Sequence, residues 1–167
     1  KFNALNLWTG PFSSLHDFTA TNFSIEVKST TQDEQINIKI SNTAQLDNNR
    51  VKKLYLAVQK LQLNNNGLTL PSLIDNLKTK INNMPDARRL FEECIEAYGY
   101  SDKFRDEYED FFLKEYTSFY LVTEDFPKII NRDLSFGIHD VEYKIDINSI
   151  EKFIINNKKI ESEISNI

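Results

Sequence analysis

Alternation of apolar and polar residues predicts three strands near the start of the chain. Residues 23–28 and 35–41 alternate with a period of two, as strands with two different faces do. The shorter segment 14–18 is expected to be extended as well. Because the connector 29–34 is polar and short enough for a hairpin, we expect these segments to form an antiparallel three-stranded meander.

A spacing of three and four residues between apolar positions predicts helices in the middle of the chain. The first is capped by Asp47 or Asn48, ends at the Asn66-Gly67 turn, and has one apolar face made of Val51, Leu54, Tyr55, Val58 and Leu61. Further helices are expected over 73–81, over 86–98 before Gly99, and over 104–116.

The last third of the chain predicts two more strands and a terminal helix. The apolar run 118–122 is typical of a buried strand, 141–147 alternates, and 149–160 has a short helical pattern. The fold class is therefore α/β, of the mixed α+β kind, in one domain over residues 1–167. Since the chain opens at Lys1 in what resembles the middle of a domain, we expect its N-terminal part to be missing.

Composition narrows the class of protein. The 167 residues are 40% hydrophobic and 12% aromatic, which excludes a disordered chain or a collagen. The single cysteine, Cys94, can form neither an internal disulfide nor a CxxC zinc knuckle, which favours a reducing, cytoplasmic setting. No apolar run approaches the roughly 18 residues of a membrane span, so no membrane partner is expected.

The charge balance bears on nucleic-acid partners. A formal net charge of −5 argues against a protein that coats nucleic acid, but metal-binding carboxylates leave a nuclease open. Acidic residues are concentrated in 102–125, away from the segment 17–60. The sequence contains no GxSxG, HExxH, P-loop or GxGxxG motif, which removes the commonest hydrolase, zincin and nucleotide-binding interpretations.

The residues that point to chemistry lie on the first two predicted strands. Glu26 and Lys28 are two apart, so both side chains leave one face of the strand, while Val27 leaves the other. Asp17 lies nine residues before Glu26, at a distance along the chain that lets a hairpin bring the two acids together. Two adjacent carboxylates repel unless a cation lies between them.

This set predicts a site for a hard divalent cation. Oxygen ligands suit Mg²⁺ or Mn²⁺, with Asp17 and Glu26 as ligands and the backbone carbonyl of Val27 as a third oxygen. Lys28 would stand beside the attacking water and stabilise negative charge at phosphorus. The residues therefore form a coherent site for metal-dependent phosphodiester hydrolysis.

The same pattern resembles the PD-(D/E)XK nucleases, which have the fold of restriction endonucleases. Over about residues 8–147 the chain is similar to a bacterial family of PD-(D/E)XK proteins linked to restriction-modification and phage-defence systems. The segments that carry the resemblance are Trp8-Thr9-Gly10-Pro11, His16-Asp17-Phe18, Ile25-Glu26-Val27-Lys28-Ser29-Thr30, Gln45-Leu46, Leu54-Tyr55-Leu56-Ala57-Val58, Leu70-Pro71-Ser72-Leu73, Phe119-Tyr120 and Phe126-Pro127-Lys128-Ile129.

The resemblance implies a restriction-endonuclease-like αβββαβ core, DNA as the substrate, Asp17 and Glu26 as metal ligands, and Lys28 as the catalytic lysine. There are two departures from the family pattern. His16 replaces the proline that precedes the first acid, and residues 1–16 hold none of the helical acids that many members carry upstream. If that acid was lost with the N-terminal part, this chain is expected to be weak or inactive.

Four further residues are candidates for contact with DNA. Gln45 follows the third strand, where it would orient a ligand or touch a phosphate, and a turn or capping role is equally consistent with the sequence. Arg50, Lys52 and Lys53 lie on or beside the first predicted helix and could hold phosphates, with a solvated helix face as the alternative. For His16, a structural or surface role competes with a contact in the site.

Two functions are left open by the sequence. The first is a Mg²⁺-dependent DNA endonuclease of a bacterial restriction or phage-defence system. The second is an inactive DNA-binding or assembly module of a larger complex, and a purely structural domain with a Glu26–Lys28 surface pair is a weaker third. Because cleavage of two strands needs two sites, a homodimer is an expectation from chemistry. Whether an ATPase or methyltransferase partner subunit is needed stays open.

Overall fold

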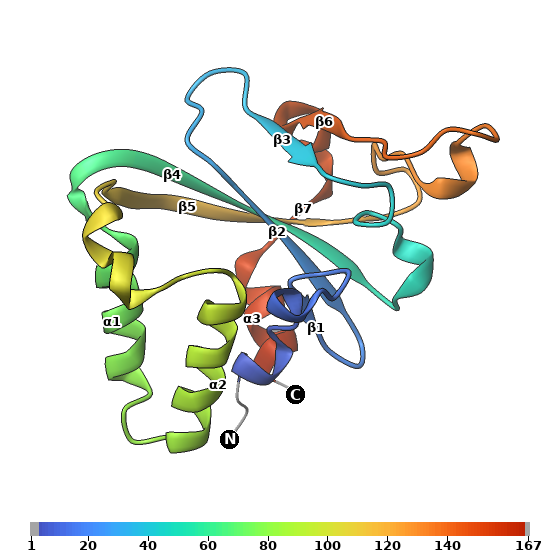
Figure 1. The fold of residues 1–167 in the computed structure, drawn as a ribbon. Coiled ribbons are helices and arrows are strands. Elements are labelled where there is room, and N and C mark those ends of the chain that lie inside the picture. The colour runs from blue at the N-terminus through green and yellow to red at the C-terminus, as the bar shows by residue number, and fades with distance from the viewer. Residues whose placement is uncertain (1–3, 166–167) are drawn as a thin grey trace.

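A computed structural model describes residues 4–165 as a mixed α/β fold with two sheets, which confirms the expected class (Figure 1). The main sheet has the order β1-β2-β4-β5-β7, and β3 and β6 form a separate ribbon. The strands are β1 (Phe18–Thr19), β2 (Ser24–Thr30), β3 (Asn37–Ile40), β4 (Leu54–Leu68), β5 (Phe112–Leu121), β6 (Tyr143–Asp146) and β7 (Ile154–Ile155). The α-helices are α1 (Leu70–Lys80), α2 (Pro85–Ala97) and α3 (Asn157–Ser165).

Short 3₁₀ helices connect these elements. They are η1 (Ala4–Leu7), η2 (Gly10–Phe12), η3 (Asn48–Arg50), η4 (Asp102–Glu107), η5 (Asn131–Asp133) and η6 (Ile147–Phe153). Asp47, Ser101 and Asp146 each accept a backbone N–H at the start of η3, η4 and η6 with a side-chain oxygen. None of the described helices is both long and apolar enough to cross a membrane.

The hairpin of β1 and β2 forms, but its first strand is Phe18–Thr19 and not the predicted extended segment 14–18, of which residues 15–17 form bends. The two strands pair antiparallel, with Phe18 opposite Ile25 and Thr19 opposite Ser24. The Trp8 backbone bridges to Phe18 on the outer side, so the N-terminal segment covers the end of this edge. The hairpin is the part of the predicted meander that the structure confirms.

The third strand of the predicted meander pairs elsewhere. β3 is antiparallel to β6, with Ile38 opposite Ile145, and it makes no ladder with β2. The connector 29–34 therefore does not form a hairpin. Alternation in β3 fixes which side chains point inward, and Ile38 and Ile40 are buried, but alternation does not specify the strand that takes the backbone hydrogen bonds.

The predicted helix through Val51 and Leu61 is wrong, because this segment is the long central strand β4. β4 is parallel to β2 and antiparallel to β5. Its first five residues, 54–58, are all buried, so both faces of the strand are covered. A run buried on both faces has no polar alternation, and its apolar positions can be fitted equally to a helical spacing.

The predicted helix over 104–116 is also wrong. The short η4 ends at Glu107, and Phe112 begins the ten-residue strand β5, which contains most of the predicted strand 118–122. The strand expected over 141–147 is confirmed as β6, in the shorter range Tyr143–Asp146. The expected terminal helix over 149–160 is replaced by η6, β7 and then α3.

The helices over 73–81 and 86–98 are confirmed as α1 and α2. The Thr69 hydroxyl accepts the Ser72 N–H at the start of α1, and proline occupies the first turn of each helix. The inner face of α2 buries Ala87, Phe91 and Cys94. Cys94 is therefore a buried part of the packing, as its position on an apolar face predicts.

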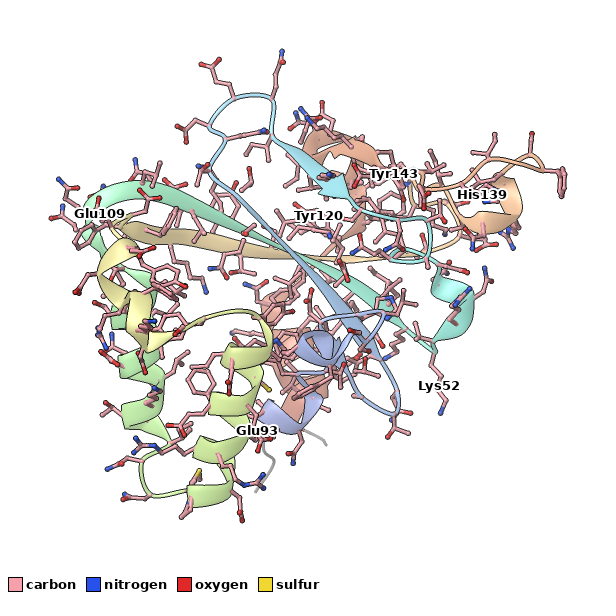
Figure 2. All side chains as sticks on the ribbon, viewed as in Figure 1. Lys52, Glu93, Glu109, Tyr120, His139 and Tyr143 are labelled. Atoms are coloured by element: carbon pink, nitrogen blue, oxygen red, sulfur yellow. The ribbon has the colours of Figure 1, made fainter. Side chains whose placement is uncertain are left out.

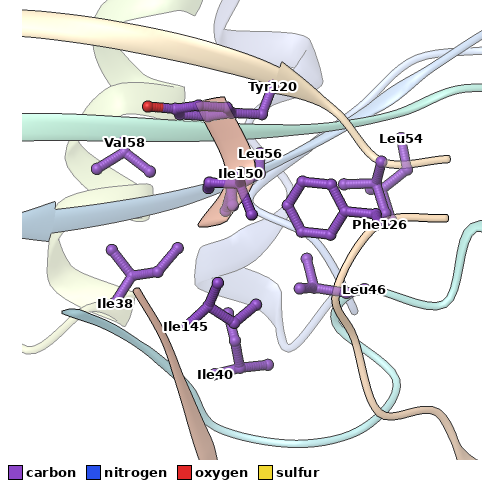
Figure 3. Close-up of a cluster of buried hydrophobic side chains, with 11 residues drawn as sticks. Ile38, Ile40, Leu46, Leu54, Leu56, Val58, Tyr120, Phe126, Ile145 and Ile150 are labelled. Carbon is purple, nitrogen blue, oxygen red and sulfur yellow. The ribbon is translucent and has the colours of Figure 1, made fainter. Parts of the chain in front are cut away.

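Two hydrophobic clusters cover the two faces of the main sheet. The larger cluster joins one face of β4 to the β3–β6 ribbon and the segment around Phe126 and Ile150 (Figure 3). The smaller one packs α3, through Ile160, against Ile25, Tyr55 and Ala57. In Figure 1 the ribbon lies above the sheet, and the three α-helices lie below it.

The central position of β4 makes a test of the core possible within one strand. Leu56 is fully buried and Leu63 is 59% exposed. We expect Leu56→Ala to lower the free energy of unfolding by about 2–5 kcal/mol, because it leaves a cavity between two layers. Leu63→Ala should change it by no more than about 0.5 kcal/mol. Urea denaturation measures both variants, and equal losses would contradict this assignment of the core.

Candidate active site

Glu26 and Lys28 stand on the same face of β2, as the strand period predicts. They lie beside Leu56 and Val58 of β4, so their side chains project on the face that carries the larger hydrophobic cluster. The Lys28 ammonium is 2.8 Å from Glu26 Oε1, and the side chains are only 15% and 4% exposed. The pair is therefore largely removed from water, at the rim of the core.

Asp17 lies at the free edge of β2, immediately before β1. Its Oδ2 accepts a 2.8 Å hydrogen bond from the Val27 N–H. The Ser24 N–H is directed the opposite way, to Lys53 O at the start of β4. Because backbone groups alternate in direction along a strand, Val27 turns both its N–H and its C=O toward the edge that Asp17 occupies.

The two carboxylates are close enough to affect each other electrostatically. Burial, with a smaller contribution from the negative charge of Asp17, raises the pKa of Glu26 to about 7, although the hydrogen bond and charge of Lys28 act in the opposite direction. Of the described residues, only Lys28 contributes a hydrogen bond to the Glu26 carboxylate. The Lys28 ammonium thus neutralises Glu26 in a site of low exposure, while Asp17 acts on Glu26 through its charge.

Gln45 connects this site to the loop that follows β3. Its Oε1 accepts hydrogen bonds from Lys28 Nζ at 3.1 Å and from the Ser41 N–H at 2.9 Å. Its backbone carbonyl lies 3.1 Å from His16 Nε2. Gln45 therefore lies inside the candidate site and orients the lysine.

His16 has a structural place beside Asp17. Its ring is 3% exposed, and burial lowers its pKa, so the neutral form is favoured at pH 7. The contact of its Nε2 with the Gln45 backbone ties the start of the hairpin to the loop after β3. This environment favours a structural role for His16 over a direct contact in the site.

Tyr98, at the C-terminal end of α2, also contacts Asp17. No pattern in the sequence indicates this contact. Its hydroxyl donates to Asp17 Oδ1 over 3.0 Å. Its ring stacks on Trp8, with the ring centroids 5.6 Å apart. Tyr98 is 81 residues from Asp17 along the chain, and no local pattern relates residues so far apart.

The candidate DNA contacts are arranged differently from the prediction. The predicted α-helix is absent at this place. The 3₁₀ helix η3 carries Arg50, and the short connection from η3 to β4 carries Lys52 and Lys53. Lys53 forms an ion pair with Glu163 of α3 at 2.6 Å, and Lys52 donates to Asn22 in the turn of the hairpin. The exposed Arg50 is close enough for its charge to lower the pKa of His16.

The acid-rich segment is remote from these cations. Figure 2 shows Glu109 and Lys52 at opposite ends of the long β4–β5 pair. The same view places His139 in the loop between η5 and β6. The negative net charge therefore does not gather around the candidate site.

The donor set fits a small hard cation. Among residues 4–165, no three His, Cys, Asp or Glu side chains form a cluster that could hold a metal ion. The Asp17 carboxylate lies at the edge of β2, toward which the Val27 carbonyl is directed. The Glu26 carboxylate projects from the adjoining face and is paired with the Lys28 ammonium alone. Mg²⁺ takes one or two carboxylates and completes its shell with water and substrate oxygens, so this arrangement suits it better than Zn²⁺.

An acid at the edge of a hairpin, beside a strand that bears Glu-x-Lys, is the arrangement of nuclease-like PD-(D/E)XK proteins. Residues 1–148 match the model of the family DUF4420, described as "Putative PD-(D/E)XK family member". The chain belongs to this family, and its mixed sheet with flanking helices is compatible with the PD-(D/E)XK fold. No curated protein and no solved structure gave a significant match.

The raised pKa of Glu26 makes stability depend on pH in the cation-free protein. Its pKa rises from an ordinary 4.5 to about 7, so folding favours the protonated form. The contribution is complete below pH 4.5 and is lost as the pH rises through 7. We expect the free energy of unfolding to fall over this window by at most about 3 kcal/mol.

Urea denaturation between pH 4.5 and 8 measures this effect. Glu26→Gln should remove the decline, because glutamine has no proton to lose. Glu142→Gln is the matched control, since Glu142 is an exposed glutamate in an ion pair with Lys39. An identical pH dependence in the wild type and in Glu26→Gln would contradict the assignment.

Proposed function

We propose that this protein is a Mg²⁺-dependent endonuclease that hydrolyses phosphodiester bonds in DNA, as part of a bacterial restriction or phage-defence system. Membership of a PD-(D/E)XK family supports a nuclease. The observation that carries the proposal is the contact of Asp17 with the edge of β2, beside Glu26 and Lys28. Cleavage of DNA is the chemistry that this combination supports best.

In this proposal Asp17, Glu26 and the carbonyl of Val27 hold the cation. When bound, Mg²⁺, or Mn²⁺ in its place, supplies positive charge that offsets the two carboxylates and the charge developing on the phosphate. The cation-free pair of Glu26 with Lys28 supports this role, because a buried glutamate with one neutralising partner favours additional positive charge.

Lys28 is the residue that acts on the attacking water. Its ammonium is held between Glu26 Oε1 and Gln45 Oε1, which fixes its direction before the substrate binds. A positioned ammonium can orient the water and stabilise the negative charge that forms at the phosphorus. Gln45 therefore acts on the reaction through Lys28 in this proposal.

Arg50 and Lys52 are the exposed cations that would contact DNA phosphates near this edge. Gln45 is a weaker candidate because its Oε1 already accepts two hydrogen bonds. Lys53 is weaker because its ion pair with Glu163, at 2.6 Å, is shorter than the 3.3 Å contact of Arg50 with Asp47, while Lys52 meets only the neutral Asn22 side chain. A DNA substrate in a bacterial cell implies a cytoplasmic location. Cleavage of both strands would require two copies of the site, most simply in a homodimer, with ATPase or methyltransferase subunits as further partners.

Plasmid cleavage tests the catalytic assignment. We expect Lys28→Met to lower the rate of nicking of supercoiled DNA in Mg²⁺ by about 10²–10⁴-fold, because methionine replaces the unbranched stem of lysine but lacks its terminal ammonium. Lys39→Met is the control, since Lys39 forms an exposed ion pair on the separate β3–β6 ribbon. Undiminished cleavage by Lys28→Met would count against the proposal.

Cation binding tests the ligand assignment without activity. Calorimetric titration with Mn²⁺ should show one site that Asp17→Asn abolishes, because an amide carries no charge. Asp110→Asn, in the exposed acid-rich segment, should leave the titration unchanged. If DNA binds while cation binding is absent, and Asp17→Asn has no effect, the non-catalytic DNA-binding module becomes the better description.

A further inference from the structure

The Asp17 carboxylate is fixed at both of its oxygens. Oδ2 accepts the Val27 N–H at 2.8 Å, and Oδ1 accepts the Tyr98 hydroxyl at 3.0 Å. The first bond comes from the strand that carries Glu26 and Lys28, and the second comes from the end of α2. The carboxylate is thus oriented by two elements that are distant in the sequence.

The N-terminal segment holds this arrangement together. The Trp8 ring stacks on the Tyr98 ring, with the centroids 5.6 Å apart, and so limits where the Tyr98 hydroxyl can lie. The N–H groups of Thr9 and Gly10 both donate to the Asp17 backbone carbonyl, at 2.9 and 3.0 Å.

Gly10 leaves the space that the contact needs. A methyl group at this position would lie 2.6 Å from the Tyr98 hydroxyl oxygen and 2.8 Å from Asp17 Oδ1. Both distances are shorter than any carbon–oxygen contact that side chains tolerate. The absence of a side chain at residue 10 therefore allows the tyrosine to approach the carboxylate.

We propose that Tyr98 is a positioning residue for the cation site, whose hydroxyl orients the Asp17 carboxylate toward the divalent ion shared with Glu26. The inference rests on the proposed function and extends it from the hairpin to α2. Outer groups that hydrogen-bond a ligating carboxylate fix its direction, and their loss typically weakens cation binding 10–100-fold. A tyrosine hydroxyl is protonated at neutral pH, so it can donate to the Asp17 carboxylate there.

Tyr100 provides a matched control on the same turn. Its hydroxyl donates to Asp102 at 2.8 Å, outside the candidate site. We expect Tyr98→Phe to weaken Mn²⁺ binding about 10–100-fold, measured by electron paramagnetic resonance of free and bound Mn²⁺. Tyr100→Phe should leave the affinity unchanged. Because Tyr98 is 55% exposed and phenylalanine keeps the ring, the thermal midpoint of Tyr98→Phe should stay close to that of the wild type.

A spectroscopic measurement separates positioning from a general structural effect. The ¹³Cζ resonance of Tyr98 should shift when Mg²⁺ is added to the wild type, because the hydroxyl bonds a carboxylate that binds the ion. It should not shift in Asp17→Asn. As a second variant, Gly10→Ala keeps the tyrosine but removes room for its hydroxyl, so it should weaken Mn²⁺ binding in the same direction as Tyr98→Phe.

The outcomes distinguish this inference from the proposed function. If Asp17→Asn binds Mn²⁺ like the wild type, the proposed cation site itself is wrong. If Asp17→Asn loses binding while Tyr98→Phe and Gly10→Ala retain it, the site stands and the role of Tyr98 is refuted. Loss of binding in Tyr98→Phe and Gly10→Ala, with Tyr100→Phe unaffected, supports the role.

Discussion

The hydrogen bond from the Val27 N–H to the Asp17 carboxylate is the contact on which the candidate site depends. The ladder between β1 and β2 covers only Ser24 and Ile25 of β2. Among the described residues, Val27 therefore has no strand partner on the side of β2 that faces β1. Asp17 takes the place of that partner and satisfies the next free backbone donor. An acid used in this way is held beside the strand that carries Glu26 and Lys28, at the edge of β2 opposite β4.

The site combines burial with an excess of negative charge. Taking Glu26 out of water disfavours its charged form, and one ammonium is not sufficient to restore its ordinary pKa. A pair of this kind contributes little to stability, because desolvation offsets much of the attraction between the charges. Its place at the rim of a well-packed core is compatible with the cation site proposed above.

The remaining layers keep this edge in place. The first half of β4 is buried on both faces and lies parallel to β2 along seven residue pairs, which fixes the strand that bears Glu26. The β3–β6 ribbon covers one face and places Gln45 against Lys28. On the opposite side, α2 and the N-terminal segment bring Tyr98 and Trp8 to Asp17.

The sequence by itself determined strand β2, helices α1 and α2, and the common face of Glu26 and Lys28, because these depend on spacing within a few residues. Asp17, Glu26 and Lys28 were also predicted from the sequence as site residues. The exact role of these three residues is still a prediction. Strand partners were decided only by tertiary structure: β3 pairs with β6, and the segment from Leu54 is a strand because it is covered on both faces, which removes the polar alternation that marks an exposed strand. The contact of Tyr98 with Asp17 was likewise invisible, since it joins two elements through packing, and no local pattern of residues encodes which distant surfaces will meet.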